Sequence, residues 1–174
     1  MIEEGIELRE LEQKYARELL DLFNNDNVIR YTNSDRIDNC VDVEKRIKNI
    51  LAYDGYNYVI IYKSEIIGII GCILYNIDDL GYELYYMLKE NYWGRGLGKI
   101  AVKKIIDIIK KDSRVNYIFT EIVSLNIASI RIVESLGFSR YETNNKRLCK
   151  QALDEEILSY RLKIGVKDAY EKNN

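Results

Sequence analysis

The 174-residue chain contains no histidine and no proline, and its three cysteines stand far apart. Without an imidazole side chain, Ser-His-Asp triads, Cys-His dyads and HExxH zinc sites are all excluded. Cys40, Cys72 and Cys149 form no CxxC pair, and an odd, scattered set indicates a reducing compartment, not a disulfide framework. We therefore expect the cysteines to lie in the core, and we expect no metal site.

Long hydrophobic runs and a charge excess of one sign are also missing. The longest apolar run, Ile66 to Tyr75, is too short for a membrane helix, which needs roughly 20 residues. The first residues, Met1 to Glu4, lack the basic and apolar segments of a signal peptide. Lysines and arginines number 26 against 28 aspartates and glutamates, which is not the basic excess of a nucleic-acid-binding protein. We expect a soluble, cytoplasmic protein that binds neither nucleic acid nor membrane.

The spacing of apolar residues predicts one mixed α/β domain over residues 1–164, followed by a polar tail at 165–174 that we expect to fray. Asn24 to Asn27 is interpreted as a turn that ends the first helix. Lys63-Ser64-Glu65 is interpreted as the turn of a hairpin. The expected fold is a largely antiparallel sheet with helices on both faces. Strands are expected at 6–9, 56–62, 66–75, 82–88, 115–122, from 138 and at 156–162, and helices at 15–23, 41–52, 96–111 and 128–136.

The most specific local feature is the glycine-rich segment 92–99, between a predicted strand and a predicted helix. A helix N-terminus exposes N–H groups and partial positive charge, and glycines let the backbone approach an anion, so the segment predicts a phosphate cradle. It is not a P-loop, because Ile100 follows Lys99 where Ser or Thr is needed, and its GxGxG spacing departs from GxGxxG. The alternatives are a loose dinucleotide site with Glu121, as in a nucleotide-dependent oxidoreductase, and a glycine turn that binds nothing.

Two motifs resemble the GNAT superfamily of N-acetyltransferases. Tyr92 to Lys99 resembles the superfamily's acetyl-CoA pyrophosphate loop, Gln/Arg-x-x-Gly-x-Gly/Ala, with Trp93 at the first position. That Trp is similar to the branch containing the ribosomal-protein N-terminal acetyltransferases. Residues 126–138 resemble the N-x-x-S…E-K-x-G-F motif of the same branch, and weaker matches lie at 27–31 and 83–88. The resemblance implies the acyl-CoA N-acyltransferase fold.

The resemblance also implies an acetyl-CoA-dependent N-acetyltransferase that uses direct transfer in a ternary complex, with no metal. The acceptor would be a primary amine on a protein N-terminus, a polyamine, an antibiotic or another small molecule, and a homodimer stays open. The alternative is a non-catalytic acyl-CoA-binding or regulatory module on the same scaffold. The residues expected to bind the cofactor are Met87, Leu88, Trp93, Gly94, Arg95, Gly96, Leu97, Gly98, Lys99 and Asn126.

In the absence of histidine, the base that deprotonates the amine is expected to be a carboxylate acting directly or through water. Glu83, Tyr85 and Met87 share one strand face by the period of two. If Met87 meets the acetyl group, Glu83 is on the same side and is the first choice of base. The alternative is that Glu83 is only a solvated or salt-bridged strand residue. The resemblance places the N–H of Met87 or Leu88 against the thioester carbonyl as an oxyanion donor.

The thiolate that leaves needs a proton, and the resemblance suggests Ser129 or a nearby tyrosine, of which Tyr31 and Tyr85 are candidates. An equally simple interpretation is that Ser129 or Asn126 caps the short helix. Tyr85 stands where the family strand motif has glycine, which predicts a narrower acceptor pocket.

The acceptor itself is not fixed by the sequence. The acidic residues Asp35, Asp38 and Asp42 would attract a cationic acceptor, or merely keep a loop soluble.

Overall fold

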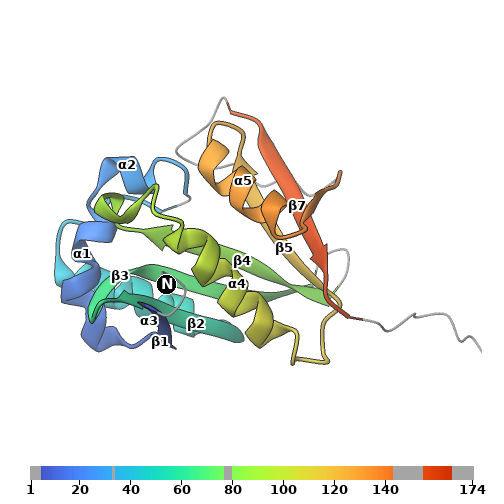
Figure 1. The fold of residues 1–174 in the computed structure, drawn as a ribbon. Coiled ribbons are helices and arrows are strands. Elements are labelled where there is room, and N and C mark those ends of the chain that lie inside the picture. The colour runs from blue at the N-terminus through green and yellow to red at the C-terminus, as the bar shows by residue number, and fades with distance from the viewer. Residues whose placement is uncertain (1–4, 33, 77–79, 143–154, 166–174) are drawn as a thin grey trace, which may run out of the picture.

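The computed structural model describes residues 5–32, 34–76, 80–142 and 155–165, and shows one twisted sheet flanked by helices (Figure 1). The strands of this part are β1 Ile6–Glu10, β2 Gly55–Tyr62, β3 Glu65–Asn76, β4 Leu80–Leu88, β5 Tyr117–Val123, β6 Ser139–Arg140 and β7 Ile157–Lys163. The α-helices are α1 Ala16–Phe23, α2 Asp26–Ile29, α3 Cys40–Leu51, α4 Leu97–Ile109 and α5 Ile127–Ser135, with 3-10 turns η2 Gln13–Tyr15 and η3 Glu90–Tyr92.

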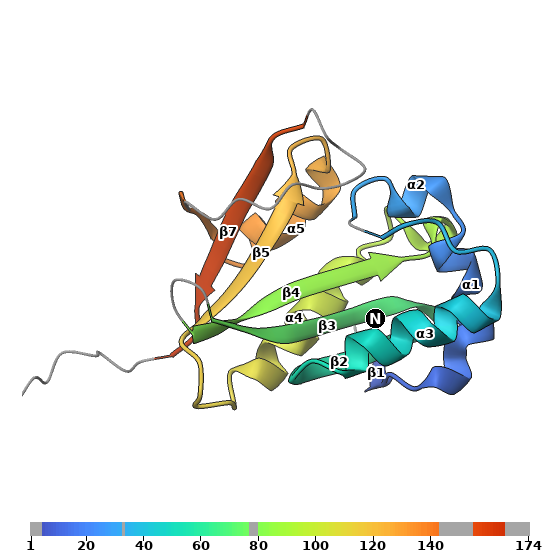
Figure 2. The same ribbon diagram turned by 180° about the vertical axis from the view of Figure 1, so that it is seen from behind.

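The sheet has the order β1-β2-β3-β4-β5-β7-β6, and every neighbouring pair is antiparallel except β4 and β5. Helices α1 and α3 cover one face, and α4 and α5 cover the other (Figures 1 and 2). Strand alternation supplies both layers: Val59 and Ile69 belong to the cluster under α1 and α3, whereas Ile60 and Ile70 belong to the cluster under α4. The predicted fold class is confirmed.

The amphipathic spacing of the sequence explains where the long helices lie. In α3, Val43 and Ile47 are four residues apart and fully buried. In α4, Leu97, Ala101, Ile105 and Ile109 repeat the same interval, with at most 1% exposure. The boundaries predicted for these helices agree with the structure to within two residues.

Segment 24–27 differs from its prediction. The turn after α1 is followed at once by α2, a single helical turn, because the Asn25 side chain accepts hydrogen bonds from the N–H groups of Asn27 and Val28. An asparagine that ends one helix can therefore begin another.

The parallel pair β4–β5 is joined over a short stretch only. Gly81, Tyr82 and Glu83 pair with Tyr117, Ile118 and Phe119, and no later position of either strand is paired to the other. Beyond Glu83 the two strands diverge, as Figure 1 shows, while β3 stays paired with β4 up to Leu88. The sheet thus opens at its centre, next to the start of α4.

Among the described residues no helix is both long and apolar enough to cross a membrane. Cys72 is buried, as expected, whereas Cys40 is only half-buried, and both are free thiols. Cys149 and the tail beyond residue 165 lie outside the described residues.

Candidate active site

The opening between β4 and β5 belongs to a cleft of about 770 Å³. Most of its lining comes from four parts of the chain: β4, the segment from η3 into α4, the end of β5 with the start of α5, and residues from α1 to α3. Ile69 and Ile73 of β3 and Ile157 of β7 complete it. Of the catalytic and cofactor-binding residues predicted from the sequence, all but Arg95 line this cleft. The structure therefore brings the predicted strand, glycine loop and short helix to one place.

The glycine loop faces the cleft with bare backbone. Gly94 and Gly96 have φ values of 70° and 76°, which side chains rarely adopt, and a Cβ on either would meet nothing within 4 Å. Gly96 is the N-cap of α4 and offers no side chain to the first N–H groups of the helix. The amides of Leu97 and Gly98 follow directly. An anion placed there would meet N–H groups and the positive end of a 13-residue helix.

Trp93 fastens this loop to the strand before it. Its indole Nε1 donates a 2.8 Å hydrogen bond to the carbonyl of Leu88. The guanidinium of Arg95 lies 5.3 Å from the centre of the Tyr92 ring, outside the cleft, whereas Lys99 lies on the lining. Of Arg95 and Lys99, which were both expected to bind the cofactor, only Lys99 lines the cleft.

Strand β4 presents different residues on its two faces. Tyr85 and Met87 pack with the cluster under α1 and α3, and Glu83 shares their face by the period of two. Leu84 and Leu88 belong to the cluster under α4. Glu83 is half-buried on the cleft lining, on the side of α1 and α3.

Tyr85 is tied into the sheet. Its hydroxyl donates a 2.6 Å hydrogen bond to Oδ1 of Asn57, and burial raises the pKa of the phenol. Its ring fills the space above Gly71, its partner on β3, where a Cβ would come within 2.4 Å of the ring. The extra bulk predicted at this position is thus largely accommodated in the space that Gly71, which has no side chain, leaves free.

The start of α5 carries the other predicted polar residues. Asn126 is the N-cap, and its Oδ1 accepts a 3.2 Å hydrogen bond from the N–H of Ser129. The capping role considered for Asn126 is confirmed, and Ser129 is not the cap.

Tyr86 is a residue that the sequence reasoning missed. Its hydroxyl is buried and has no hydrogen-bond partner of good geometry among the described residues. Burial raises its pKa to about 12, although the neighbouring Ser129 hydroxyl acts in the opposite direction. It lines the cleft, on the β4 face opposite to Glu83. Strand alternation gives the face of β4 on which Tyr86 lies, but not the absence of a hydrogen-bond partner that marks it out.

The wall built by α1 to α3 has a different chemistry. Its lining residues are Phe23, Asn27, Val28, Tyr31, Thr32, Ser34, Arg46 and Ile50, which include no carboxylate. Asp38 pairs with Arg36, Asp42 pairs with Lys45, and Asp35 is exposed. None of these three acidic residues lines the cleft. No group of three His, Cys, Asp or Glu that could hold a metal ion occurs in the part of the chain that the structure describes.

Comparison with known proteins agrees with this geometry. A family model described as "Acetyltransferase (GNAT) domain" matches residues 6–139. The "Uncharacterized N-acetyltransferase p20" of Bacillus licheniformis is 26% identical over 143 residues, which are 79% of this chain and 80% of that protein.

Two solved structures illustrate the likeness of fold. Spermidine N-acetyltransferase from Vibrio cholerae, in complex with CoA and spermine, has a TM-score of 0.76 at 17% identity and covers 92% of this chain and 96% of its own. An acetyltransferase from Salmonella typhimurium that modifies the N-terminal serine of ribosomal protein L7/L12 has a TM-score of 0.73 at 17% identity, with the same coverage of 92% and 96%.

Proposed function

Because the chain belongs to the acetyltransferase (GNAT) domain family, we propose that it moves the acetyl group of acetyl-CoA directly to a primary amine, with both substrates held in the cleft. The observation that carries this proposal is the separation of β4 from β5 after Glu83, which ends at an open glycine loop. A phosphate-binding helix start beside a gap between strands suits a molecule with a diphosphate and a long flexible arm.

The cofactor would lie along β4. In this proposal the N–H groups from Gly94 to Lys99 bind the diphosphate, and the ammonium of Lys99 adds positive charge. The arm then runs back into the gap and meets Leu88 first, since Leu88 is the end of β4 nearest the loop. Asn126 and Trp93 contribute by holding α5 and the loop in place.

The backbone of β4 supplies the oxyanion donor. Lys89 N–H donates 2.8 Å to the Ile67 carbonyl on β3, and N–H groups alternate sides along a strand. The N–H of Met87 therefore points to β3, and those of Tyr86 and Leu88 point to the gap. The Leu88 carbonyl accepts a hydrogen bond from Trp93 and therefore does not point to β3. This agrees with the assigned direction, because the N–H and C=O of one strand residue point to the same side. We assign the backbone of Leu88 to a contact with the cofactor arm and the N–H of Tyr86 to a hydrogen bond with the thioester oxygen. Loss of such an oxyanion donor raises the activation free energy by about 3–4 kcal/mol.

Glu83 is the proposed base. An amine with an ordinary pKa near 10 arrives as an ammonium and must lose a proton before it attacks. Glu83 faces the α1 to α3 side of the cleft, and its carboxylate would take that proton directly or through water. The C–N bond then forms as the C–S bond breaks, and the attacking nitrogen releases its second proton to water as the neutral amide forms. The base and the leaving sulfur lie on opposite sides of β4.

Tyr86 and Ser129 face the leaving sulfur in this arrangement. A phenol with a pKa of about 12 stays protonated and can donate a hydrogen bond. Full transfer of its proton to a thiolate of ordinary pKa, about 8.5, would be uphill by about 5 kcal/mol. Tyr86 thus stabilises the charge on sulfur as it develops, helped by Ser129, and the sulfur takes its final proton from solvent.

The proposal is tested by binding and turnover measured separately on the same protein. Acetyl-CoA at about 100 times its Kd should add about 2.7 kcal/mol of stability, seen as a raised Tm, whereas NAD and ATP should do little. Thiol release with a panel of peptides, polyamines, aminoglycosides and amino acids then measures transfer. Binding without turnover of any amine would favour the non-catalytic acyl-CoA-binding module, and a Tm shift with NAD alone would contradict both.

A further inference from the structure

The cleft wall that would receive the acceptor contains one cation, Arg46, and no carboxylate among the described lining residues. Arg46 lies on α3 between the buried residues Val43 and Ile47. One nitrogen, Nη2, donates a 3.0 Å hydrogen bond to Oγ of Ser34, which is only 4% exposed. The side chain thus reaches from α3 across to the segment after α2.

Among the residues that the structure describes, the guanidinium of Arg46 has no counter-ion. In the described part of the chain no carboxylate lies within ion-pair distance of it, and its Nε is buried with no acceptor. By contrast, Lys45 on the same helix pairs with Asp42, and Arg36 pairs with both Asp26 and Asp38. Acidic residues are therefore close in sequence, but they bind other cations.

A half-buried guanidinium with an idle N–H group is energetically unfavourable unless something completes it. Arginine presents up to five N–H donors in a planar fork that matches carboxylate and phosphate oxygens. Here one donor fixes the fork against Ser34, and the Nε donor is unused. An anion would accept a hydrogen bond from the unused donor and balance the positive charge of Arg46.

The position of Arg46 fits an acceptor-bound anion. Burial raises the pKa of Tyr85, and the positive charge of Arg46 acts in the opposite direction, so the two side chains are near each other. Tyr85 shares its β4 face with Glu83, the proposed base. An anion on Arg46 and an amine at Glu83 would then lie on one side of the strand.

We infer that the acceptor is an amine that also carries an anionic group, carboxylate or phosphate, which Arg46 binds with the support of Ser34. This inference rests on the proposed acetyl transfer and narrows its substrate class. It disfavours polyamines, because a polycation would meet the positive charge of Arg46 on a wall that supplies no carboxylate. The simpler alternative is that Arg46 only ties α3 to Ser34.

The test compares acceptors that differ only in the anion. The carboxylate arm uses the α-amino acids against their amides, the phosphate arm uses phosphoethanolamine against ethanolamine, and spermidine is the polycation. In one of the two arms the anionic member should exceed its neutral partner about 10- to 100-fold in kcat/KM, as expected for charged hydrogen bonds. Arg46→Gln should bring that ratio close to one, and Arg46→Lys should give an intermediate ratio. Lys45→Gln, on the exposed side of the same helix, should leave the ratio unchanged.

A binding arm separates this inference from the transfer reaction. With CoA present, the N-acetylated acid should raise the Tm of the wild-type protein more than its N-acetylated amide, and phosphoethanolamine more than ethanolamine if phosphate is the anion. Neutral or polycationic acceptors that match the anionic ones, or an Arg46→Gln loss that is equal for both members of a pair, would overturn the inference. If no amine is turned over, the proposed function fails and the Tm difference alone decides the anion site.

Discussion

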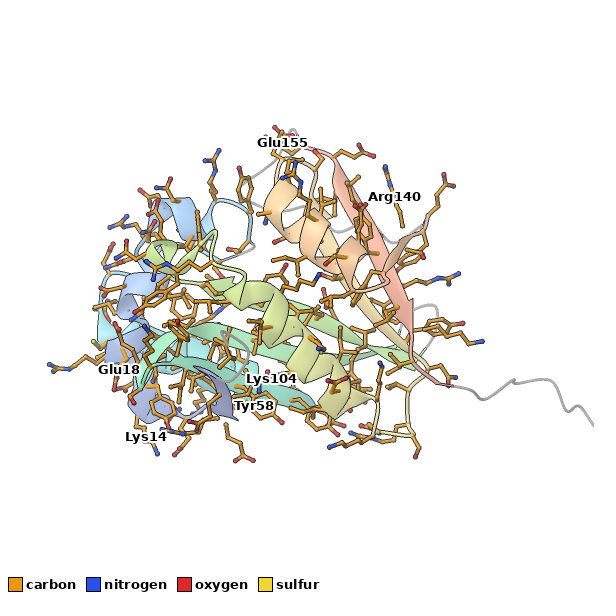
Figure 3. The ribbon with its side chains drawn as sticks, viewed as in Figure 1. Lys14, Glu18, Tyr58, Lys104, Arg140 and Glu155 are labelled. Carbon is orange, nitrogen blue, oxygen red and sulfur yellow. The ribbon has the colours of Figure 1, made fainter. Side chains whose placement is uncertain are left out.

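Exchange of Glu83 for glutamine keeps the size of the side chain and removes its ability to take a proton. We expect Glu83→Gln to lower kcat/KM by about 10²- to 10⁴-fold, the usual range for a positioned acid or base. The Tm shift with acetyl-CoA should not change, because Glu83 is on the acceptor face of β4. The control is Glu18→Gln on α1, an exposed carboxylate that does not line the cleft (Figure 3). Wild-type turnover of Glu83→Gln across the pH range would exclude Glu83 as the base.

Tyr86 offers a prediction in which activity and stability change in different directions. Tyr86→Phe removes a buried hydroxyl that has no hydrogen-bond partner of good geometry among the described residues, although the Ser129 hydroxyl is its neighbour, so the free energy of unfolding should stay the same or rise by up to about 1 kcal/mol. Turnover should fall about tenfold or more, because the leaving sulfur loses a donor. Urea unfolding and thiol-release kinetics on the same preparation measure the two effects. A stable variant with full activity would restrict Tyr86 to a packing role.

At the level of the elements, a substitution in the glycine loop should affect protein stability and ligand binding to different extents. Gly96 needs its positive φ, yet a side chain on it would enter open space in the protein alone. Gly96→Glu should therefore cost only about 1–2 kcal/mol of stability while abolishing the Tm shift with acetyl-CoA, since a carboxylate would meet the phosphates.

Gly137 provides the matched control for this loop. It also has a positive φ, of 91°, but it follows α5 and does not line the cleft. Gly137→Glu should carry a similar strain and leave acetyl-CoA binding intact. Equal loss of binding in both variants would show that the loop acts through stability and not through contact.

The elements also show which features a sequence can predict. Long helices and central strands were predicted correctly because their apolar spacing extends over many residues, as in α4. The position of the glycine loop at the start of α4 was also predicted correctly, whereas its role as a phosphate cradle stays a prediction. Short elements such as α2 depend on one capping side chain and were missed. Tyr86 and Arg46 were missed for another reason. Among the described residues Tyr86 lacks a well-placed hydrogen-bond partner and Arg46 lacks a counter-ion. Such features depend on which side chains are neighbours in space, and spacing along the chain does not reveal them.

For the whole molecule, the open sheet has to be held together at its closed end. Three residue pairs join β4 to β5, and beyond them the backbone groups of Tyr86 and Leu88 face the gap. Next to these pairs the carboxylate of Asp112, beyond the end of α4, accepts hydrogen bonds from the hydroxyls of Tyr82 on β4 and Tyr56 on β2, at 2.7 and 3.1 Å. Arg114 binds the same carboxylate at 2.8 Å. This network ties the helix to two strands where the cleft closes.

The network predicts how stability depends on pH. The Arg114 guanidinium, followed by the two tyrosine hydroxyls, holds the pKa of Asp112 well below its usual value, although burial alone would raise it. A depressed folded-state pKa contributes stability that is complete above the unfolded pKa, about 3.9, and is lost as the pH falls below it. Asp112→Asn should therefore cost about 1–3 kcal/mol at pH 7, on the scale of charged hydrogen bonds.

The difference between Asp112→Asn and wild type, measured by urea unfolding, should shrink as the pH is lowered from about 5 toward 2, because the wild-type carboxylate becomes protonated. Asp107→Asn, an exposed change on α4, should show no such dependence. Since the closed end sets where β4 and β5 part, Asp112→Asn should also weaken acetyl-CoA binding while all residues of the cleft lining are unchanged. A variant with lower stability but wild-type acetyl-CoA affinity would mean that the lining, and not the closed end, determines the width of the cleft.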